Sequence, residues 1–183
     1  MRERHPKKSG QAIIELLVAM SILIIGFLAA VRLLTQSFGI TRVIEDSYKG
    51  TYLAVEGIEI VKNLVAFNIN SGALITDGLA DDCYHMNYET NLTPRDPVIN
   101  PDTPQPTASR NPKTNPPLSF DESTKLYGYG AGTPTSFWRL ICVKADDDAG
   151  VPYRIAVSST VVWQTRGGGE FSATLEDYFY ARP

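Results

Sequence analysis

The residue that most needs a chemical explanation is Glu15. It is the only charged residue among the twenty from Ala12 to Val31, most of which are aliphatic. A carboxylate inside such a run costs roughly 2.5 kcal/mol or more if the run enters a membrane, and residues of this kind usually pair with a cation. Lys7 and Lys8 lie just upstream and would supply one near the lipid headgroups. The chemistry that this region offers is therefore ion pairing.

The sequence contains few side chains that are suited to catalysis. After His5 there is one histidine, His85, so no set of serine, histidine and aspartate can be argued from it. Residues 81–85 combine two aspartates, a cysteine and this histidine, but the second ligand cluster of a zinc site is missing. We interpret the segment as a polar loop, and we expect no enzymatic activity and no cofactor.

Three consecutive aspartates form the remaining candidate metal site. Asp146 and Asp148 would place oxygen ligands at alternating positions ahead of Gly150, which suits calcium. No glutamate follows at the spacing of the bidentate ligand in a calcium loop. A solvated hairpin loop accounts for the same acids, so we expect no bound metal.

The apolar run itself has the length of a transmembrane helix. Twenty residues cover about 30 Å as an α-helix, which is the thickness of the hydrocarbon core of a bilayer. Four basic residues lie among the first ten, and this bias keeps the N-terminus in the cytoplasm and exports everything after Val31. We expect a single-pass protein of the cytoplasmic (inner) membrane whose C-terminal domain lies outside.

A buried core helix and a secretory signal peptide both fit this run less well. The core helix would be shorter and would show polar positions at every turn. A signal peptide cleaved near Ala30 would have a core free of charge, whereas Glu15 lies near the start of this one. The formal net charge of -3 and the pI of about 5.4 argue against direct nucleic-acid binding.

Residues 7–20, with the sequence KKSGQAIIELLVAM, resemble the class III leader of type IV pilins and type II secretion pseudopilins. In that family a short basic leader ends in glycine, a prepilin peptidase cuts after it on the cytoplasmic side, and the new N-terminal residue is commonly N-methylated. The resemblance places the cut between Gly10 and Gln11 and identifies Glu15 as the characteristic glutamate. Family members usually have Phe or Met after the cut, so Gln11 is a departure that leaves its methylation open.

Under this resemblance Glu15 acquires a specific partner. Cleavage would create a cationic α-amino group at Gln11 beside apolar surface, and Glu15 of an adjacent subunit would neutralise it as a filament grows. Leaving either desolvated charge unpaired costs several kcal/mol, so the pair would set the axial register of neighbouring helices. The resemblance thus implies prepilin peptidase, other pilin or pseudopilin subunits and inner-membrane lipid as partners.

Helical periodicity continues past the apolar run and ends at the helix-stopping residues 68–72. An unbroken helix from Gln11 to Asn68 would be roughly 87 Å long. We expect a transmembrane or filament-core part, 11–34, followed by an amphipathic part, 35–70. The apolar series that defines the second part is Ile44, Tyr48, Thr51, Val55, Ile58, Val61 and Val65.

The C-terminal third is typical of an antiparallel sheet. The runs 136–144, 152–163 and 170–180 are rich in β-branched and aromatic residues, with a glycine-rich turn at 166–169. The last hairpin also resembles the ending of minor, PilV-like pilins. Before these runs, residues 71–135 are expected to form an irregular, Pro-rich loop region. The predicted fold class is α+β. After a leader at 1–10, a long N-terminal helix packs on a small antiparallel sheet at 136–183. This arrangement is the pilin-like lollipop shape, a long helix that carries a small domain at one end.

Cys83 and Cys142 are the only two cysteines, and both would be exported. An oxidising compartment allows them one intrachain pairing, which would close a long loop and stabilise the fold by about 2–4 kcal/mol. Two free thiols, in a host without oxidative folding, are the alternative.

These observations favour a structural subunit of a type IV pilus-like or pseudopilus filament. The alternative function is a membrane-anchored binding protein that does not polymerise and uses its exported β domain as a receptor surface. A substitution at Glu15 separates the two, because only incorporation into a filament needs the carboxylate.

Overall fold

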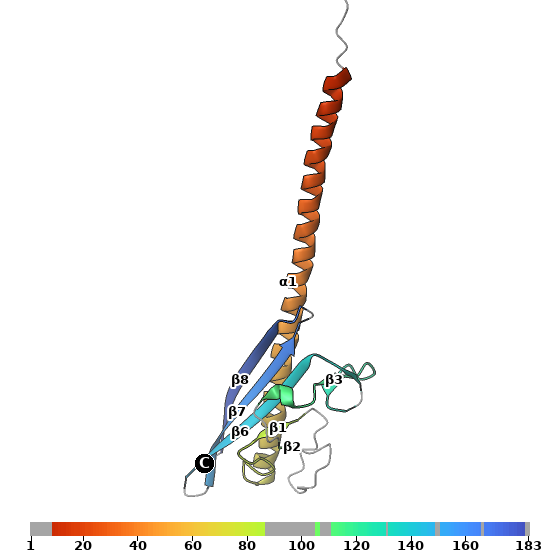
Figure 1. Ribbon diagram of the computed structural model, residues 1–183. Coiled ribbons are helices and arrows are strands. Elements are labelled where there is room, and N and C mark those ends of the chain that lie inside the picture. The colour runs from red at the N-terminus through yellow and green to blue at the C-terminus, as the bar shows by residue number, and fades with distance from the viewer. Residues whose placement is uncertain are drawn as a thin grey trace, which may run out of the picture. The chain divides into compact units, whose positions relative to one another are not determined.

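The structure is a computed structural model, and it describes residues 9–86, 105–106, 111–130, 132–148, 151–165 and 167–181. Within these residues one long α-helix, α1, precedes a set of short and then long β-strands (Figure 1). The chain divides into two compact units, 1–44 and 45–183.

The first unit is the N-terminal part of α1, which begins at Ser9. Every side chain from Gln11 to Arg42 is exposed. The Ser21 hydroxyl donates to the Leu17 carbonyl one turn back, at 2.7 Å, so it needs no partner outside the helix. By length and composition this helix could cross a membrane, with a mean hydropathy of 2.6 over its most apolar 18 residues.

The second unit packs the C-terminal part of α1, which ends at Ser71, on an antiparallel sheet, and this confirms the predicted α+β class. The sheet has the order β2-β1-β6-β7-β8, and a smaller antiparallel sheet has the order β4-β3-β5. The strands are β1 Cys83–His85, β2 Gln105–Pro106, β3 Ser119–Phe120, β4 Tyr127–Gly128, β5 Thr133–Pro134, β6 Phe137–Asp148, β7 Val151–Gln164 and β8 Glu170–Tyr180; a 3-10 helix, η1, spans Pro112–Thr114.

Alternation along the strands creates the core. On β7 the side chains at 155, 157, 159 and 161 are buried, while the alternate side chains at 156, 158 and 160 are only partly covered. Successive side chains of a strand point to opposite faces, so one face of β7 meets α1 and the other forms the outer face of the sheet. The buried face predicted for this run is confirmed.

Glycines let α1 approach this face closely. A Cβ built on Gly50 would lie 2.5 Å from the Trp163 ring, and one on Gly57 would overlap the Ser159 hydroxyl. Ala54, which lies between the two glycines on the same side of the helix, is fully buried. Gly50 and Gly57 therefore serve packing, because only a residue without a side chain fits at either position.

Only three of the seven residues in the apolar series predicted for this part of the helix are buried, namely Ile58, Val61 and Val65. The other four, Ile44, Tyr48, Thr51 and Val55, are exposed. The helix carries two apolar stripes, and the sheet covers the one that contains the small residues, because that stripe allows the closer contact.

The region predicted to be irregular, 71–135, contains more structure than expected. Strands β1, β2, β3, β4 and β5 and helix η1 all lie within it or at its end. They are two or three residues long, too short for a periodic pattern to reveal. Residues 87–104 and 107–110, which hold part of the Pro-rich stretch, lie outside the described residues.

Candidate functional site

Glu15 lies on the exposed surface of the first unit, one helical turn after Gln11. The ion pairs of the described residues do not include it. The next basic residue of the described chain is Arg32, seventeen positions along α1 and so about 25 Å away. Within the part of the chain that the structure describes, Glu15 therefore has no cationic partner; Lys7 and Lys8 lie outside that part.

The predicted cleavage point falls at the start of α1. Gly10 is the second residue of the helix and Gln11 the third, while residues 1–8 of the predicted leader lie outside the described residues. Cleavage after Gly10 would leave Gln11 as the first residue of the helix. Its α-amino group would then lie one turn from Glu15 of the same chain and exposed to any neighbour.

Exposed apolar surface extends past the twenty-residue apolar run that ends at Val31. Beyond Val31 the side chains of Leu33, Leu34, Phe38 and Ile40 are all more than half exposed. From Gln11 to Ile44 the first unit is about 50 Å long, whereas the hydrocarbon core of a bilayer is about 30 Å thick. The exposed apolar side chains thus cover a length greater than the hydrocarbon core of one bilayer, and exposed apolar surface of this extent is typical of interaction sites.

The aspartates considered as a candidate calcium site belong to a strand. Residues 146–148 are the end of β6, which corrects the loop expected there. Asp146 forms an ion pair with the Arg154 guanidinium, whose Nε lies 2.8 Å from the carboxylate. Since this carboxylate already has a cationic partner, it is a poor calcium ligand. The side chain of Asp148 is outside the described part, and no cluster of three or more acids, histidines or cysteines within that part is placed to hold a metal.

His85 also lies in a strand, β1, and not in the polar loop expected for residues 81–85. Its ring packs against Tyr129 with a centroid distance of 5.3 Å. Burial is the main influence on its pKa and lowers it, because a buried site disfavours the charged imidazolium; a hydrogen bond with Asn115 opposes this. The histidine therefore has a packing role as a neutral ring.

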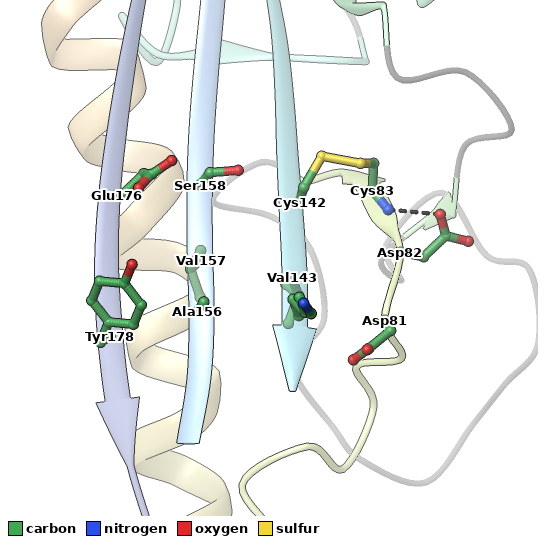
Figure 2. Close-up of a pocket in the computed structure, with 11 residues that line it drawn as sticks. Asp81, Asp82, Cys83, Cys142, Val143, Ala156, Val157, Ser158, Glu176 and Tyr178 are labelled. Atoms are coloured by element: carbon green, nitrogen blue, oxygen red, sulfur yellow. Dashed lines mark hydrogen bonds between the residues drawn. A yellow bond between two sulfur atoms is a disulfide. The ribbon is translucent and has the colours of Figure 1, made fainter. Parts of the chain in front are cut away.

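A shallow depression of about 350 Å³ lies on the outer face of the sheet, away from α1 (Figure 2). Residues from β6, β7 and β8 and from the segment around β1 line it. Three acidic side chains and one basic side chain stand around its rim, beside one tyrosine. The residues that matter for its chemistry are Asp81, Asp82, Lys144, Ser158, Glu176 and Tyr178. Nothing in the sequence pattern indicated it, because its walls come from four separate segments.

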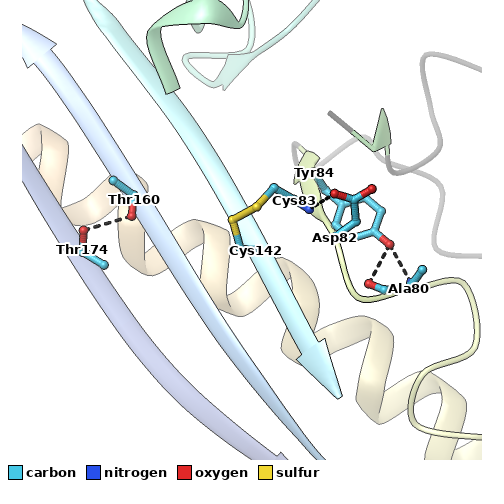
Figure 3. Close-up of a disulfide and its surroundings, with 7 residues drawn as sticks. All are labelled: Ala80, Asp82, Cys83, Tyr84, Cys142, Thr160 and Thr174. Atoms are coloured by element: carbon cyan, nitrogen blue, oxygen red, sulfur yellow. Dashed lines mark hydrogen bonds between the residues drawn. A yellow bond between two sulfur atoms is a disulfide. The ribbon is translucent and has the colours of Figure 1, made fainter. Parts of the chain in front are cut away.

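The two cysteines form the predicted disulfide at one side of this depression (Figure 3). Cys83 on β1 lies directly opposite Cys142 on β6, so the bond joins neighbouring strands that are 59 residues apart in sequence. Next to it the Tyr84 hydroxyl donates to the Ala80 carbonyl at 2.9 Å. Because β1 has only three residues, the bond adds a covalent link to the short backbone pairing that joins it to β6.

A buried arginine is the polar feature that sequence reasoning missed. Arg139 is fully buried on the helix side of β6 and donates to the carbonyls of Leu53 and Met86 at 3.1 and 2.6 Å. Its guanidinium also lies 3.0 Å from Glu56 of α1. One signal in the sequence could have revealed it. The alternation of buried and exposed residues along β6 places the basic residue Arg139 on the buried face of the strand. These contacts tie the helix, β6 and the end of β1 together.

No protein-family model matches this chain, and neither a curated protein nor a solved structure resembles it closely enough to count as a match. Its function has to be argued from its own residues.

Proposed function

We propose that this chain is a prepilin-type structural subunit of an extracytoplasmic filament of the type IV pilus or pseudopilus kind. It would be inserted in the inner membrane with its N-terminus inside and cut by a prepilin peptidase between Gly10 and Gln11. The mature subunit would then leave the membrane and join a filament whose core consists of bundled α1 helices.

The observation that carries the proposal is the excess length of exposed apolar helix. About 50 Å of α1 lies in the first unit with its side chains uncovered, and the apolar residues continue past the reach of one bilayer. A subunit that stayed in the membrane would expose Phe38 and Ile40 to water. In a bundle of sibling helices the same side chains would be buried, at roughly 25 cal/mol per Å² of apolar surface removed from water.

Glu15 would act in this bundle as the charge that selects the register. It has no cationic partner among the described residues of its own chain, and apolar helices offer no other feature against which to align. An ammonium group on Gln11 of a neighbouring copy supplies the missing cation. Burial between helices strengthens such a pair and makes its absence costly.

The test is a comparison of two acid-to-valine variants of the full chain, produced in cells with the peptidase and the assembly machinery. Glu15→Val is expected to insert in the membrane normally and to lower recovery in sheared filaments at least tenfold. Glu59→Val, which removes an exposed acid of α1 in the second unit, is the matched control and should assemble normally. Equal recovery of both variants in filaments would contradict the proposal.

The alternative, a membrane-anchored binding protein that does not polymerise, is favoured by one observation, the depression on the outer face of the sheet. Under this alternative neither variant would appear in a filament fraction, and the unsubstituted chain would not either.

A further inference from the structure

The free edge of β8 is the most distinctive unused feature of the second unit. β8, Glu170–Tyr180, is the last strand in the sheet order, and it pairs with β7 on one side (Figure 1). Among the described residues no strand pairs with its other side. Eleven residues make a long edge, and unprotected edges of this length are sites where another strand can add.

The hydrogen bonds at both ends of the β7–β8 hairpin show which backbone groups are free. The Ala181 amide donates to the Tyr153 carbonyl, and the Thr165 amide donates to the Gly169 carbonyl. Because bonded and non-bonded pairs alternate along an antiparallel ladder, the odd-numbered residues of β8 bond to β7. The even-numbered residues therefore direct their amide and carbonyl groups to the free edge.

One of these outward amides already has a partner. The Tyr178 amide donates to the carboxylate of Asp177 at 2.8 Å, which protects the edge at that point. Within the described part of the chain, the outward amides of Ser172, Thr174 and Glu176 form no such contact. A row of three adjacent outward positions is thus open to an incoming strand.

Charge determines which strand fits. β8 contains Glu170, Glu176 and Asp177 and no basic residue. Lys113 neutralises Glu170 at 2.7 Å, but the described residues give Glu176 and Asp177 no ion pair. A second copy of β8 would bring the same acids to the edge with no base to offset them, which disfavours pairing of the strand with itself.

The outer face of the sheet beside this edge is also mainly acidic. Glu176 and Tyr178 project from β8 toward the depression, on the side of the sheet that carries the disulfide (Figure 2). Asp81 and Asp82 line the opposite rim, and Lys144 is the one cation among the lining residues. The Arg154 guanidinium, which is paired with Asp146, lies beyond the lining at 5.3 Å from the centroid of the Tyr178 ring. In an added strand the residue opposite Glu176 would place its side chain on the same outer face, next to the Glu176 carboxylate. A long basic side chain there would meet the Glu176 carboxylate, for which the described residues give no ion pair.

We propose that the free edge of β8 is a strand-addition site for an extended, lysine- or arginine-bearing segment of another protein, with a basic side chain beside the Glu176 carboxylate on the outer face. The inference concerns the second unit alone and does not rest on the filament proposal. The backbone of β8 would supply the hydrogen bonds, and the acids would select basic partners over acidic or self-complementary strands.

The test measures fluorescence anisotropy of labelled peptides with the full chain in a neutral detergent. The probe is an eight-residue peptide of alternating lysine and threonine, and its control has glutamate in place of lysine. We expect the basic peptide to bind at least tenfold more tightly than the acidic one. Absence of binding by the basic peptide, or equal binding of both, would overturn the proposal.

Two variants separate strand addition from simple charge attraction. Glu176→Lys should weaken binding of the basic peptide at least tenfold. Ser172→Pro removes an outward amide that β7 does not use and places the ring where the added strand would lie, so it should also weaken binding while unfolding stays unchanged. Unchanged binding to Ser172→Pro would show charge attraction only, and it would contradict strand addition.

Hydrogen exchange keeps the proposal testable if the proline variant fails to fold. In the unsubstituted chain the amides of Ser172, Thr174 and Glu176 should exchange at least tenfold more slowly when the basic peptide is bound. Protection confined to α1, or protection that depends on chain concentration without peptide, would overturn the proposal in favour of helix binding or self-association.

Discussion

The two parts of α1 both carry large apolar side chains, yet only the second part buries them within this chain. From Gln11 to Arg42 every side chain is exposed, whereas Leu53, Val61 and Leu64 are buried against the sheet. In the second part the stripe that carries the small residues has one partner, and that partner is the sheet. Apolar residues on all sides need an apolar environment all round, which lipid and then a bundle of sibling helices would provide.

The glycines of α1 show the same contrast. A side chain at Gly26 or Gly39 would meet nothing within 4 Å, whereas one at Gly50 or Gly57 would collide with the sheet. In the first unit the space beside Gly26 and Gly39 is not occupied by any other part of this chain. In the second unit Gly50 and Gly57 set the distance between the helix and the sheet. The same residue type thus has a structural role in only one of the two parts.

Removal of the disulfide should give the largest change, and it should affect the second unit alone. The double variant Cys83→Ser, Cys142→Ser opens a loop of 59 residues, so the free energy of unfolding should fall by about 4 kcal/mol. Both tryptophans of the sequence, Trp138 and Trp163, lie in this unit, so denaturant unfolding followed by tryptophan fluorescence reports it. Thr174→Ala, on the same outer face, is the control and should cost less than about 1 kcal/mol. Impaired membrane insertion of the serine variant would contradict the independence of the two parts.

A matched pair of glycine substitutions tests the contrast between the parts directly. Gly57→Ala should lower the free energy of unfolding by about 2 kcal/mol, because the added methyl overlaps the Ser159 hydroxyl and lies 3.2 Å from Ile141 Cδ1. Gly26→Ala meets no neighbour in this chain and should leave the same transition unchanged. If the two variants unfold alike, the close contact between α1 and the sheet is wrong.

Acidification should give the smallest effect. Burial lowers the pKa of His85 in the folded state, so the unfolded chain binds its proton more readily. The stability tied to this group is present above pH 6.5 and is lost as the pH falls below that value. The pKa of the Glu45 carboxyl is lowered by its hydrogen bond to Lys49, so its stabilising effect is lost only below about pH 4.5. Thermal unfolding measured between about pH 7 and 5 should show the loss of stability that is tied to His85. The variant His85→Phe should abolish this loss, and an unchanged pH profile in that variant would exclude His85 as its cause.

The sequence was sufficient to predict the large elements, because each has a long repeating pattern. β7 and β8 lie within a residue or so of the runs predicted for them, and β6 extends to Asp148, beyond the predicted end at Lys144. The disulfide was predicted because only one pairing exists. Periodicity could not show which stripe of the helix is buried, since that depends on how closely Gly50 and Gly57 let the sheet approach. Arg139 and the depression were missed because their contacts join segments far apart in the chain.

The central claim is that Glu15 is retained in the mature chain, close to a newly formed N-terminus at Gln11. The direct measurement is the N-terminal residue of protein recovered from the filament fraction of cells that contain the peptidase, read by mass spectrometry of the intact chain. We predict a polypeptide that begins with Gln11, with or without a methyl group. A chain that begins at Met1, or at a residue beyond Ala30 so that Glu15 is lost, would contradict the account.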